Sequence, residues 1–282
     1  MPELPEVESI ARALRRTLAG RRCTGLRVRF AGVLQPSPAA VRRAMVGRTL
    51  VAVERLGKHL ILTFDGRQPG HVLLHLRMTG QIFLQEGYRP DRHVHLSLKF
   101  GDCTVHYRDI RKFGRWTAVG PDWRERELAH IGPDMLAVRF ASWLARVARR
   151  RAPLKSVLLD QHVAAGLGNI YADEALFRAG VHPLTEPAAC DAATLQRVLR
   201  EAKAVLRLAL RHGGTTFLNF TDFTGKPGNF RPRLQVYGRA GQPCRRCAAP
   251  IERLVVGGRS TCFCRACQPD LHESSGSVRQ LQ

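Results

Sequence analysis

Residues 244–267 read CRRCAAPIERLVVGGRSTCFCRAC and hold five of the eight cysteines in this chain of 282 residues. Cys244 and Cys247 form one C-x2-C pair, and Cys264 and Cys267 form a second pair after a spacer of sixteen residues. Four thiolates at this spacing are typical of a tetrahedral Zn²⁺ held by two knuckles. Since four thiolates leave no open coordination position, the predicted ion is structural and not catalytic. The strand-like residues between the pairs predict a β-hairpin, in which Cys262 would occupy an apolar position.

The region before these cysteines is predicted to be helical. Apolar residues recur at helical spacing in four stretches, 140–148, 154–163, 170–179 and 191–212. The segment Gly166-Leu167-Gly168-Asn169 joins two of these helices, and we interpret its amides as a phosphate clamp with Asn169 as the helix cap. An ordinary helical hairpin is the alternative. Residues 215–233 then form a loop long enough to be functional or mobile.

Between about residues 22 and 119 the hydrophobic period changes to two. Leu60, Leu62 and Phe64 alternate with other residues, and a second alternation runs through residues 94–100. This pattern is typical of half-buried antiparallel strands in a sandwich or barrel.

Three turns in this strand-rich region carry unusual side chains. Lys58 precedes a strand, Met78 stands beside a glycine turn, and residues 109–115 interleave Arg111 with Phe113. A solvated lysine and a core methionine are the ordinary interpretations of the first two. Cations around an aromatic side chain in a loop can instead grip a phosphate chain and stack on a base.

The chain opens MPELPEVE, before an amphipathic helix predicted to run to about Leu18 and to stop at Gly20. If Met1 is removed, Pro2 begins the chain with a secondary amine. A terminal amine titrates near ~7.7 to 8.0, against ~10.4 for lysine, so it can act as a nucleophile at neutral pH. The alternative is a stiff tail whose carboxylates only favour the helix N-terminus.

The composition favours a polyanionic partner. The formal net charge is +22 and the pI is about 11.0, which supports affinity for nucleic acid without implying sequence recognition. The acidic N-terminus lacks the apolar core of a signal peptide, and no apolar run approaches the roughly 20 residues of a membrane span. We therefore expect a soluble, intracellular protein.

Several ordered motifs together resemble one family. The N-terminal Pro2 with Glu3 and Glu6, the stretch GLGNIYADEALF, and LQVYGR before the four-cysteine finger are similar to the bacterial formamidopyrimidine-DNA glycosylases, base-excision enzymes for oxidised purines. The resemblance extends in order from residue 1 to residue 268. It implies an α+β fold, with an N-terminal β-sandwich flanked by a helix, a helix-two-turn-helix domain and a zinc hairpin.

The resemblance also implies a catalytic set. Pro2 would attack the sugar C1′ of the damaged nucleotide and form an iminium, and Glu3 would protonate the opening sugar. Lys58 would assist β-elimination and contact phosphate, and Arg259 of the finger would assist δ-elimination. Glu6 would hold the N-terminal region in place.

Duplex DNA is the partner that the family implies, with the damaged nucleotide flipped out because a stacked base cannot reach Pro2. The side chains matching the vacated stack are Met78, Arg111 and Phe113, with Arg111 facing the orphaned base. The positions expected to contact DNA are His75, His93, Arg111, Arg151, Asn169, Tyr237 and Lys155. One structural Zn²⁺ would be held by Cys244, Cys247, Cys264 and Cys267.

The expected domain order follows from these motifs. The ranges are 1–120 for the catalytic sandwich, 121–136 for a linker, 137–234 for the helical domain with a lesion-capping loop, 235–269 for the finger and 270–282 for a disordered tail. The resemblance further implies a monomer that acts on DNA in the bacterial cytoplasm.

Two other functions compete with this interpretation. Endonuclease VIII-like enzymes share the fold and the proline chemistry but prefer oxidised pyrimidines; their opening typically reads PEGPE, so Leu4 favours the purine branch. A non-catalytic damage-binding protein is disfavoured because Pro2, Glu3 and Lys58 are all present. The capping loop departs from the family, since Phe217-Leu218-Asn219-Phe220 stands where a basic residue is usual, so lesion preference is less secure than the chemistry.

Overall fold

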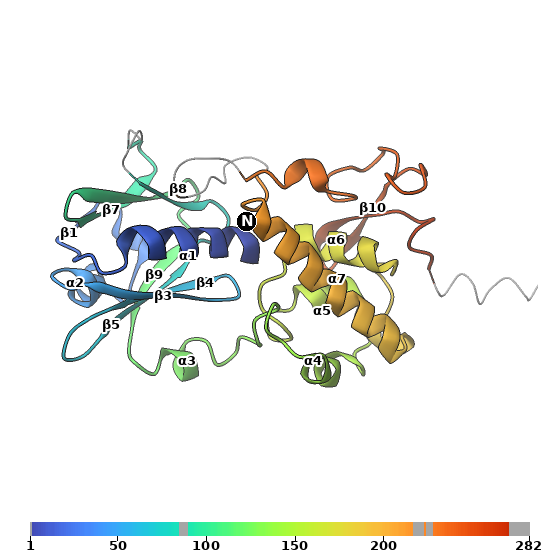
Figure 1. Ribbon diagram of the computed structural model, residues 1–282, viewed down its shortest axis with the longest axis horizontal. Coiled ribbons are helices and arrows are strands. Elements are labelled where there is room, and N and C mark those ends of the chain that lie inside the picture. The colour runs from blue at the N-terminus through green and yellow to red at the C-terminus, as the bar shows by residue number, and fades with distance from the viewer. Residues whose placement is uncertain (1, 85–89, 217–222, 224–227, 271–282) are drawn as a thin grey trace, which may run out of the picture. The chain divides into compact units, whose positions relative to one another are not determined.

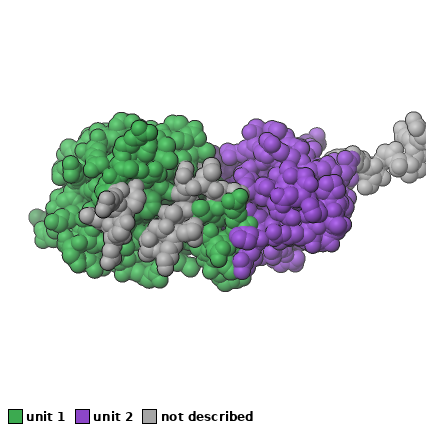
Figure 2. All heavy atoms as spheres, turned by 90° about the horizontal axis from the view of Figure 1, so that it is seen from above, with its two compact units in different colours: residues 1–130, 209–231 green, residues 131–208, 232–282 purple. Residues whose placement is uncertain are grey.

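The computed structural model describes residues 2–84, 90–216, 223 and 228–270. Its chain divides into two compact units, Met1–His130 with Ala209–Arg231 as unit 1 and Ile131–Leu208 with Pro232–Gln282 as unit 2 (Figure 2). The expected capping-loop residues 217–220 and nearly all of the expected tail lie outside the described residues.

Unit 1 contains two sheets whose apolar faces share one core (Figure 1). The first has the strand order β1 (Gly25–Val28), β7 (Val94–Phe100), β8 (Cys103–Asp109) and β6 (Gly80–Leu84). The second has the order β2 (Leu34–Gln35), β9 (Arg115–Val119), β5 (Gly70–His75), β4 (His59–Phe64) and β3 (Leu50–Leu56). Leu60 and Leu62 of one sheet and Leu96 and Leu98 of the other are buried in that core, as the alternation predicted. The predicted sandwich is confirmed.

Helix α1 (Leu4–Leu18) buries Val7, Ile10, Leu14 and Leu18 in the core of the sandwich, and it packs against β3. This confirms the predicted amphipathic helix. Its N-terminus is where Pro2 lies, so packing of the apolar stripe fixes the start of the chain on unit 1.

The two-residue period concealed a second helix, α2 (Pro38–Met45). Its sequence carries a start signal, because the Ser37 Oγ accepts a hydrogen bond from the Ala40 N–H at 3.2 Å and Pro38 occupies the first turn. Val41 and Met45 face the core one turn apart. Two shorter helical segments, η1 (Ala31–Val33) and α3 (Trp123–Arg126), were also not predicted.

Unit 2 holds most of the remaining helices and the finger hairpin. The elements are α4 (Phe140–Val147), α5 (Leu154–Leu159), α6 (Asn169–Ala179), η2 (Pro187–Ala189), α7 (Ala192–Arg211), β10 (Glu252–Val256) and β11 (Arg259–Phe263). The chain passes from one unit to the other within α7 and within η3 (Arg231–Arg233). Helix α6 packs against α5 and β11 and ends at Gly180, whose φ of +68° favours glycine. Among the described residues, no helix is long and apolar enough to span a membrane.

Candidate functional site

The residues at the start of α1 are buried and joined by hydrogen bonds. Pro2 is buried, and Glu3 and Glu6 are each 2% exposed. Glu6 Oε2 accepts a hydrogen bond from the Glu3 N–H at 2.8 Å, and its Oε1 accepts one from the Thr215 N–H at 2.8 Å. Glu6 therefore ties the residue after Pro2 to the segment that follows α7, within unit 1. The holding role expected for Glu6 in catalysis stays a prediction, which these two hydrogen bonds support.

Gly214, which follows helix α7, also borders the Glu6 carboxylate. Its φ is +85°, and a Cβ at this position would lie 2.7 Å from the Glu6 Oε1. A side chain would therefore displace the Glu6 carboxylate. The two consecutive glycines after a long helix were the available signal.

Lys58 lies in the tight turn between β3 and β4, and only 6% of it is exposed. The preceding Gly57 has a φ of +56°, which permits this turn. A solvated surface lysine is thereby excluded. The next residue, His59, pairs with His75 across the β4–β5 ladder, and their rings meet edge to face at 4.6 Å.

Both histidines are held neutral at pH 7. Burial lowers the pKa of His59 to about 4 and that of His75 to about 2, and the positive charges of Arg77 and Lys58 add to the shift. The Nδ1 of His75 accepts a hydrogen bond from the Arg77 N–H at 2.9 Å. The neutral ring therefore carries its proton on Nε2, which can donate to an anion such as a phosphate oxygen.

The side chains expected to fill a vacated stack come together on two adjoining loops. Met78 is 43% exposed and Phe113 is 47% exposed, and the Arg111 guanidinium lies 4.6 Å from the centre of the Phe113 ring. The Arg111 N–H donates to the Thr79 Oγ1 at 3.1 Å, so the loop bearing Met78 contacts the loop bearing Arg111. Exposed apolar side chains beside a cation suit insertion into a base stack.

Asp109 organises these loops, and the sequence analysis assigned it no role. It is fully buried; its Oδ1 accepts from Thr79 and from the Arg111 N–H, and its Oδ2 accepts from the Gly114 N–H at 2.8 Å. One carboxylate thus fixes both loops. An aspartate directly before the basic loop was the only signal in the sequence.

The other expected DNA contacts have mixed positions. His93 is partly exposed after β6 and its N–H donates to Asp91, whereas Arg151 is exposed between α4 and α5. Asn169 is the first residue of α6 and not its cap, which is Gly168. The Asn169 Nδ2 donates to the Ser260 carbonyl at 2.7 Å, so its amide fixes the finger hairpin within unit 2.

The expectation for Lys155 is wrong. Its side chain is fully buried, and its Nζ forms an ion pair with Asp173, which is equally buried. Burial raises the pKa of the Asp173 carboxyl, while the Lys155 ammonium opposes that rise. Asp173 Oδ2 also accepts the Cys262 N–H at 3.0 Å. A lysine enclosed in this way supports β11 and does not reach a phosphate.

Glu174, the neighbour of Asp173 on α6, holds the segment that leads into the finger. Its carboxylate accepts hydrogen bonds from the backbone N–H groups of Gln235, Val236 and Tyr237 at 2.9 to 3.0 Å. Burial raises its pKa, and these three hydrogen bonds oppose the rise. The backbone of Tyr237, an expected DNA contact, is therefore fixed by α6.

The four cysteine sulfurs converge as the spacing predicted. The Sγ atoms of Cys244, Cys247, Cys264 and Cys267 lie within 4.8 Å of one another, with separations such as 3.5 Å between Cys247 and Cys264 and 3.9 Å between Cys244 and Cys267. A tetrahedral ion with Zn–S bonds of about 2.3 Å requires sulfurs about 3.8 Å apart. The donor set therefore fits one structural Zn²⁺. Cys262 is not part of it and is buried in the apolar cluster beside the finger, as predicted.

Arg259 is the first residue of β11 and is exposed. It follows two glycines in left-handed conformation, Gly257 and Gly258, which make the hairpin turn. The hairpin, anchored by α6 and by the metal cluster, thus presents Arg259 outward. Arg259 belongs to unit 2, whereas Pro2, Glu3 and Lys58 belong to unit 1.

Known proteins are similar to this chain over most of its length. Three family models match in order: the formamidopyrimidine-DNA glycosylase N-terminal domain at residues 1–116, its H2TH domain at 131–221, and the zinc finger found in FPG and IleRS at 241–269. A formamidopyrimidine-DNA glycosylase of Methylococcus capsulatus is 42% identical over 95% of this chain and 100% of its own length. The chain belongs to the formamidopyrimidine-DNA glycosylase family. The relative from Chloroflexus aurantiacus, 41% identical over 95% of this chain and 98% of its own, has the same name.

Solved structures of the family agree with the fold. A complex between the Lactococcus lactis Fpg and an abasic site containing DNA has a TM-score of 0.89 at 30% identity and covers 95% of this chain and 100% of that one. The MutM (FPG) protein from Thermus thermophilus has a TM-score of 0.85 at 36% identity, with 95% and 98% covered. The family fold that the motifs implied is confirmed.

Proposed function

We propose that this protein is a bifunctional DNA glycosylase and abasic-site lyase that removes oxidised purines, such as formamidopyrimidines and 8-oxoguanine, from duplex DNA. The observation that carries the proposal is the buried Pro2–Glu3 start of α1, fixed by Glu6, in a chain 42% identical to a formamidopyrimidine-DNA glycosylase. Damaged DNA is the partner, as in the Lactococcus lactis complex. We further propose that the protein acts as a monomer in the bacterial cytoplasm.

Pro2 is the nucleophile of the proposed reaction once Met1 is removed. The lone pair of its secondary amine forms a bond to C1′, and the glycosidic bond breaks with its electrons leaving on the base, which takes up a proton. The C1′–O4′ bond then opens, O4′ accepts a proton from Glu3, and the amine nitrogen, having lost its own proton, becomes the iminium. An iminium withdraws electrons, so it acidifies the C2′ proton and prepares the sugar for elimination.

Lys58 and Arg259 have separate tasks in strand scission. In β-elimination the C2′ proton is removed and the C3′–O bond breaks, so the departing phosphate carries negative charge. Lys58, held in the β3–β4 turn of unit 1, supports this step, and the exposed Arg259 of the finger supports the second elimination. Neutral His75 contributes a phosphate contact through its Nε2 donor.

Flipping of the damaged nucleotide requires that its place in the duplex be filled. We assign this to Met78, Arg111 and Phe113, because these exposed side chains sit on loops joined by Asp109 and Thr79. Phosphate contacts are assigned to His93, Arg151, Asn169 and Tyr237. Bound Zn²⁺ supplies no reaction chemistry; its four thiolates hold the hairpin that bears Arg259.

The endonuclease VIII-like alternative is not favoured. The relatives from Methylococcus capsulatus and Chloroflexus aurantiacus are formamidopyrimidine-DNA glycosylases, and Leu4 matches the purine branch. Relative single-turnover rates on duplexes with 8-oxoguanine, formamidopyrimidine and oxidised pyrimidine test this assignment. Faster excision of the pyrimidine would overturn it.

Borohydride trapping tests the chemistry directly. We expect protein with Met1 confirmed absent by mass spectrometry to form a covalent adduct with DNA containing 8-oxoguanine opposite cytosine, since an iminium is reducible. Pro2→Gly should keep DNA binding and lose most excision and trapping. Cleavage of the duplex by the native protein without any adduct would disprove the iminium mechanism.

A further inference from the structure

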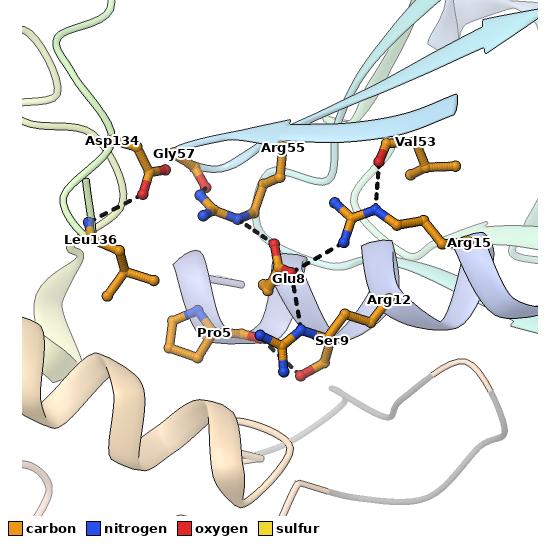
Figure 3. A network of polar contacts seen from close by, with 10 residues as sticks. All are labelled: Pro5, Glu8, Ser9, Arg12, Arg15, Val53, Arg55, Gly57, Asp134 and Leu136. Atoms are coloured by element: carbon orange, nitrogen blue, oxygen red, sulfur yellow. Dashed lines mark hydrogen bonds and ion pairs between the residues drawn. The ribbon is translucent and has the colours of Figure 1, made fainter. Parts of the chain in front are cut away.

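A polar network on the flank of α1 has no part in the chemistry assigned above (Figure 3). Its centre is Glu8, whose side chain is 12% exposed. Glu8 Oε1 accepts hydrogen bonds from the Arg12 Nε at 3.0 Å and the Arg15 Nη1 at 3.2 Å. Glu8 Oε2 accepts one from the Arg55 Nε at 2.8 Å. One carboxylate thus joins two arginines of its own helix to one arginine of β3.

Arg55 extends the network to the Lys58 turn. While its Nε donates to Glu8, its Nη1 donates to the Gly57 carbonyl at 2.9 Å. The Arg55 side chain is only 8% exposed, so both bonds are largely shielded from solvent. Gly57 has a φ of +56° and directly precedes Lys58. Arg55 therefore connects the carboxylate of α1 to the backbone that sets the position of Lys58.

The other two arginines do not reach this turn in the same way. Arg15 donates from its Nε to the Val53 carbonyl at 2.6 Å, farther along β3. Arg12 is 58% exposed and forms an ion pair with Glu8. Of the three cations on Glu8, Arg55 is the one that donates to Gly57. The network thus offers both a test residue and a matched control on the same carboxylate.

Charge keeps the network formed at neutral pH. Burial raises the pKa of Glu8, but the hydrogen bonds from Arg55 and Arg12 and the charges of Arg55 and Arg15 outweigh it, so the net pKa lies below its usual value. The carboxylate is therefore ionised at any pH at which the Pro2 amine is a nucleophile. A planar guanidinium can bond two acceptors in fixed directions at once, which a lysine ammonium on a flexible stem does not do.

We infer that Glu8 and Arg55 are positioning residues for strand scission: they hold the Gly57-Lys58 turn in register with the helix that directly follows Pro2 and Glu3. This inference rests on the proposed role of Lys58 in β-elimination. Neither residue touches the reacting atoms. Their effect is to keep the lysine where the departing C3′ phosphate forms, and displacement of a positioned group by about 1 Å can cost about 100-fold in rate.

Arg55→Gln is the test variant, because Glu8 then keeps Arg12 and Arg15 as partners and its charge stays compensated. The substrate is a duplex with a preformed abasic site, under single-turnover conditions with enzyme in excess. The fraction of DNA trapped by borohydride counts the enzyme that has formed the iminium, and the nicking rate without borohydride measures elimination. We expect nicking to slow by about 10- to 100-fold while the trapped fraction stays within about twofold of wild type.

Two variants complete the measurement. Arg12→Gln removes a cation from the same carboxylate and should leave both the nicking rate and the trapped fraction within about twofold of wild type. Arg55→Lys keeps the charge but not the two-acceptor geometry, and it should slow nicking as Arg55→Gln does. Full recovery with lysine would show that charge alone is needed and would overturn the inference.

Lys58→Ala separates failure of this inference from failure of the proposed function. If Lys58→Ala nicks slowly and Arg55→Gln nicks normally, the positioning role is wrong and the role of Lys58 stands. Normal nicking by Lys58→Ala would show that Lys58 has no role in β-elimination, on which the inference rests. A parallel fall of trapping and nicking in Arg55→Gln, together with a lower melting temperature, would show a role in folding only and would also overturn the inference.

Discussion

Lys58 and Lys155 are both buried lysines that the family resemblance assigned to the DNA side of the molecule, yet their surroundings differ. Lys58 is 6% exposed, at a turn where its charge acts on the neutral rings of His59 and His75. Lys155 is fully buried against Asp173, whose second oxygen accepts the Cys262 N–H. The first lysine adds its charge to two neutral histidines, and the second is paired with a buried carboxylate.

The different surroundings of Lys58 and Lys155 indicate different uses of the two ammonium groups. A lysine enclosed with an aspartate in this way is not available to an anion. Helix α6 instead uses its polar residues on the finger: Asn169 on Ser260, Asp173 on Cys262, and Glu174 on the segment before the first cysteine. In unit 2, Lys155 therefore helps to hold the hairpin that presents Arg259, whereas the role proposed for Lys58 of unit 1 is on the substrate.

Exchange of each lysine for alanine should separate these two uses, with the largest effect at Lys155. Removal of one partner of a buried ion pair costs about 3 to 5 kcal/mol, because the other charge is left uncompensated. For Lys155→Ala we expect a fall in melting temperature of about 10 °C by calorimetry. Lys58→Ala should lose strand scission, and its melting temperature should fall by less than that of Lys155→Ala.

A second measurement on Lys155→Ala shows which part of the protein is destabilised. Hydrogen exchange followed by mass spectrometry should show faster exchange in peptides spanning 259–268 of Lys155→Ala, and unchanged exchange in β3 and β4. Equal stability of Lys155→Ala and wild type would contradict the framework role and return Lys155 to the surface role first expected.

The motif residues were predictable from the sequence where the signal was local. The C-x2-C pairs predicted the four-cysteine cluster, because both ligands of a pair lie in one turn of the chain. The apolar stripe from Val7 to Leu18 predicted which face of α1 is buried. The partner of Lys155 was not predictable in this way, since Asp173 lies 18 residues away on another helix. A basic residue near a basic loop gives no indication of whether its side chain points out or in.

Other structural roles could not be predicted from the sequence because they depend on long-range packing. Asp109 and Gly214 act on groups that the fold brings to them, Thr79 and Glu6, and no local pattern encodes those contacts. Helix α2 is different, because Ser37-Pro38 is a helix start signal that the surrounding strand period concealed. The family resemblance supplied the roles of Pro2 and Arg259, which composition and periodicity do not contain.

Glu174→Gln tests how much α6 of unit 2 contributes to stability through the segment before the finger. The amide keeps the size but replaces an ionised acceptor of three backbone N–H groups with a neutral one, and hydrogen bonds to charged groups contribute about 1.5 to 3 kcal/mol. We expect a loss of about 2 kcal/mol in urea unfolding. Glu186→Gln, a change on the same unit outside this network, is the control and should alter stability by less than about 0.5 kcal/mol.

Acid should weaken unit 1 through the histidines beside Lys58. Their folded pKa values, about 4 for His59 and about 2 for His75, lie below the unfolded value. The unfolded chain therefore binds protons first as pH falls below about 6.5, and each histidine costs about 1 kcal/mol of stability at pH 5.5. His75→Gln should reduce the loss of stability between pH 7.5 and 5.5 by about that amount. An unchanged pH dependence would mean that His75 titrates normally in the folded protein.

The smallest effect on stability is expected at the exposed loop of unit 1. The contact of Arg111 with the Phe113 ring is on the surface, where a cation–π pair contributes about 0.5 to 1 kcal/mol. Phe113→Ala should therefore lower stability by less than about 1 kcal/mol. Stacking on a base is worth about 1 to 3 kcal/mol, so the same variant should bind a duplex with an abasic-site analogue about 10-fold more weakly by fluorescence anisotropy. A variant with unaltered affinity would remove Phe113 from the vacated stack, whereas Asp109→Asn, which loosens both loops, should weaken binding and stability together.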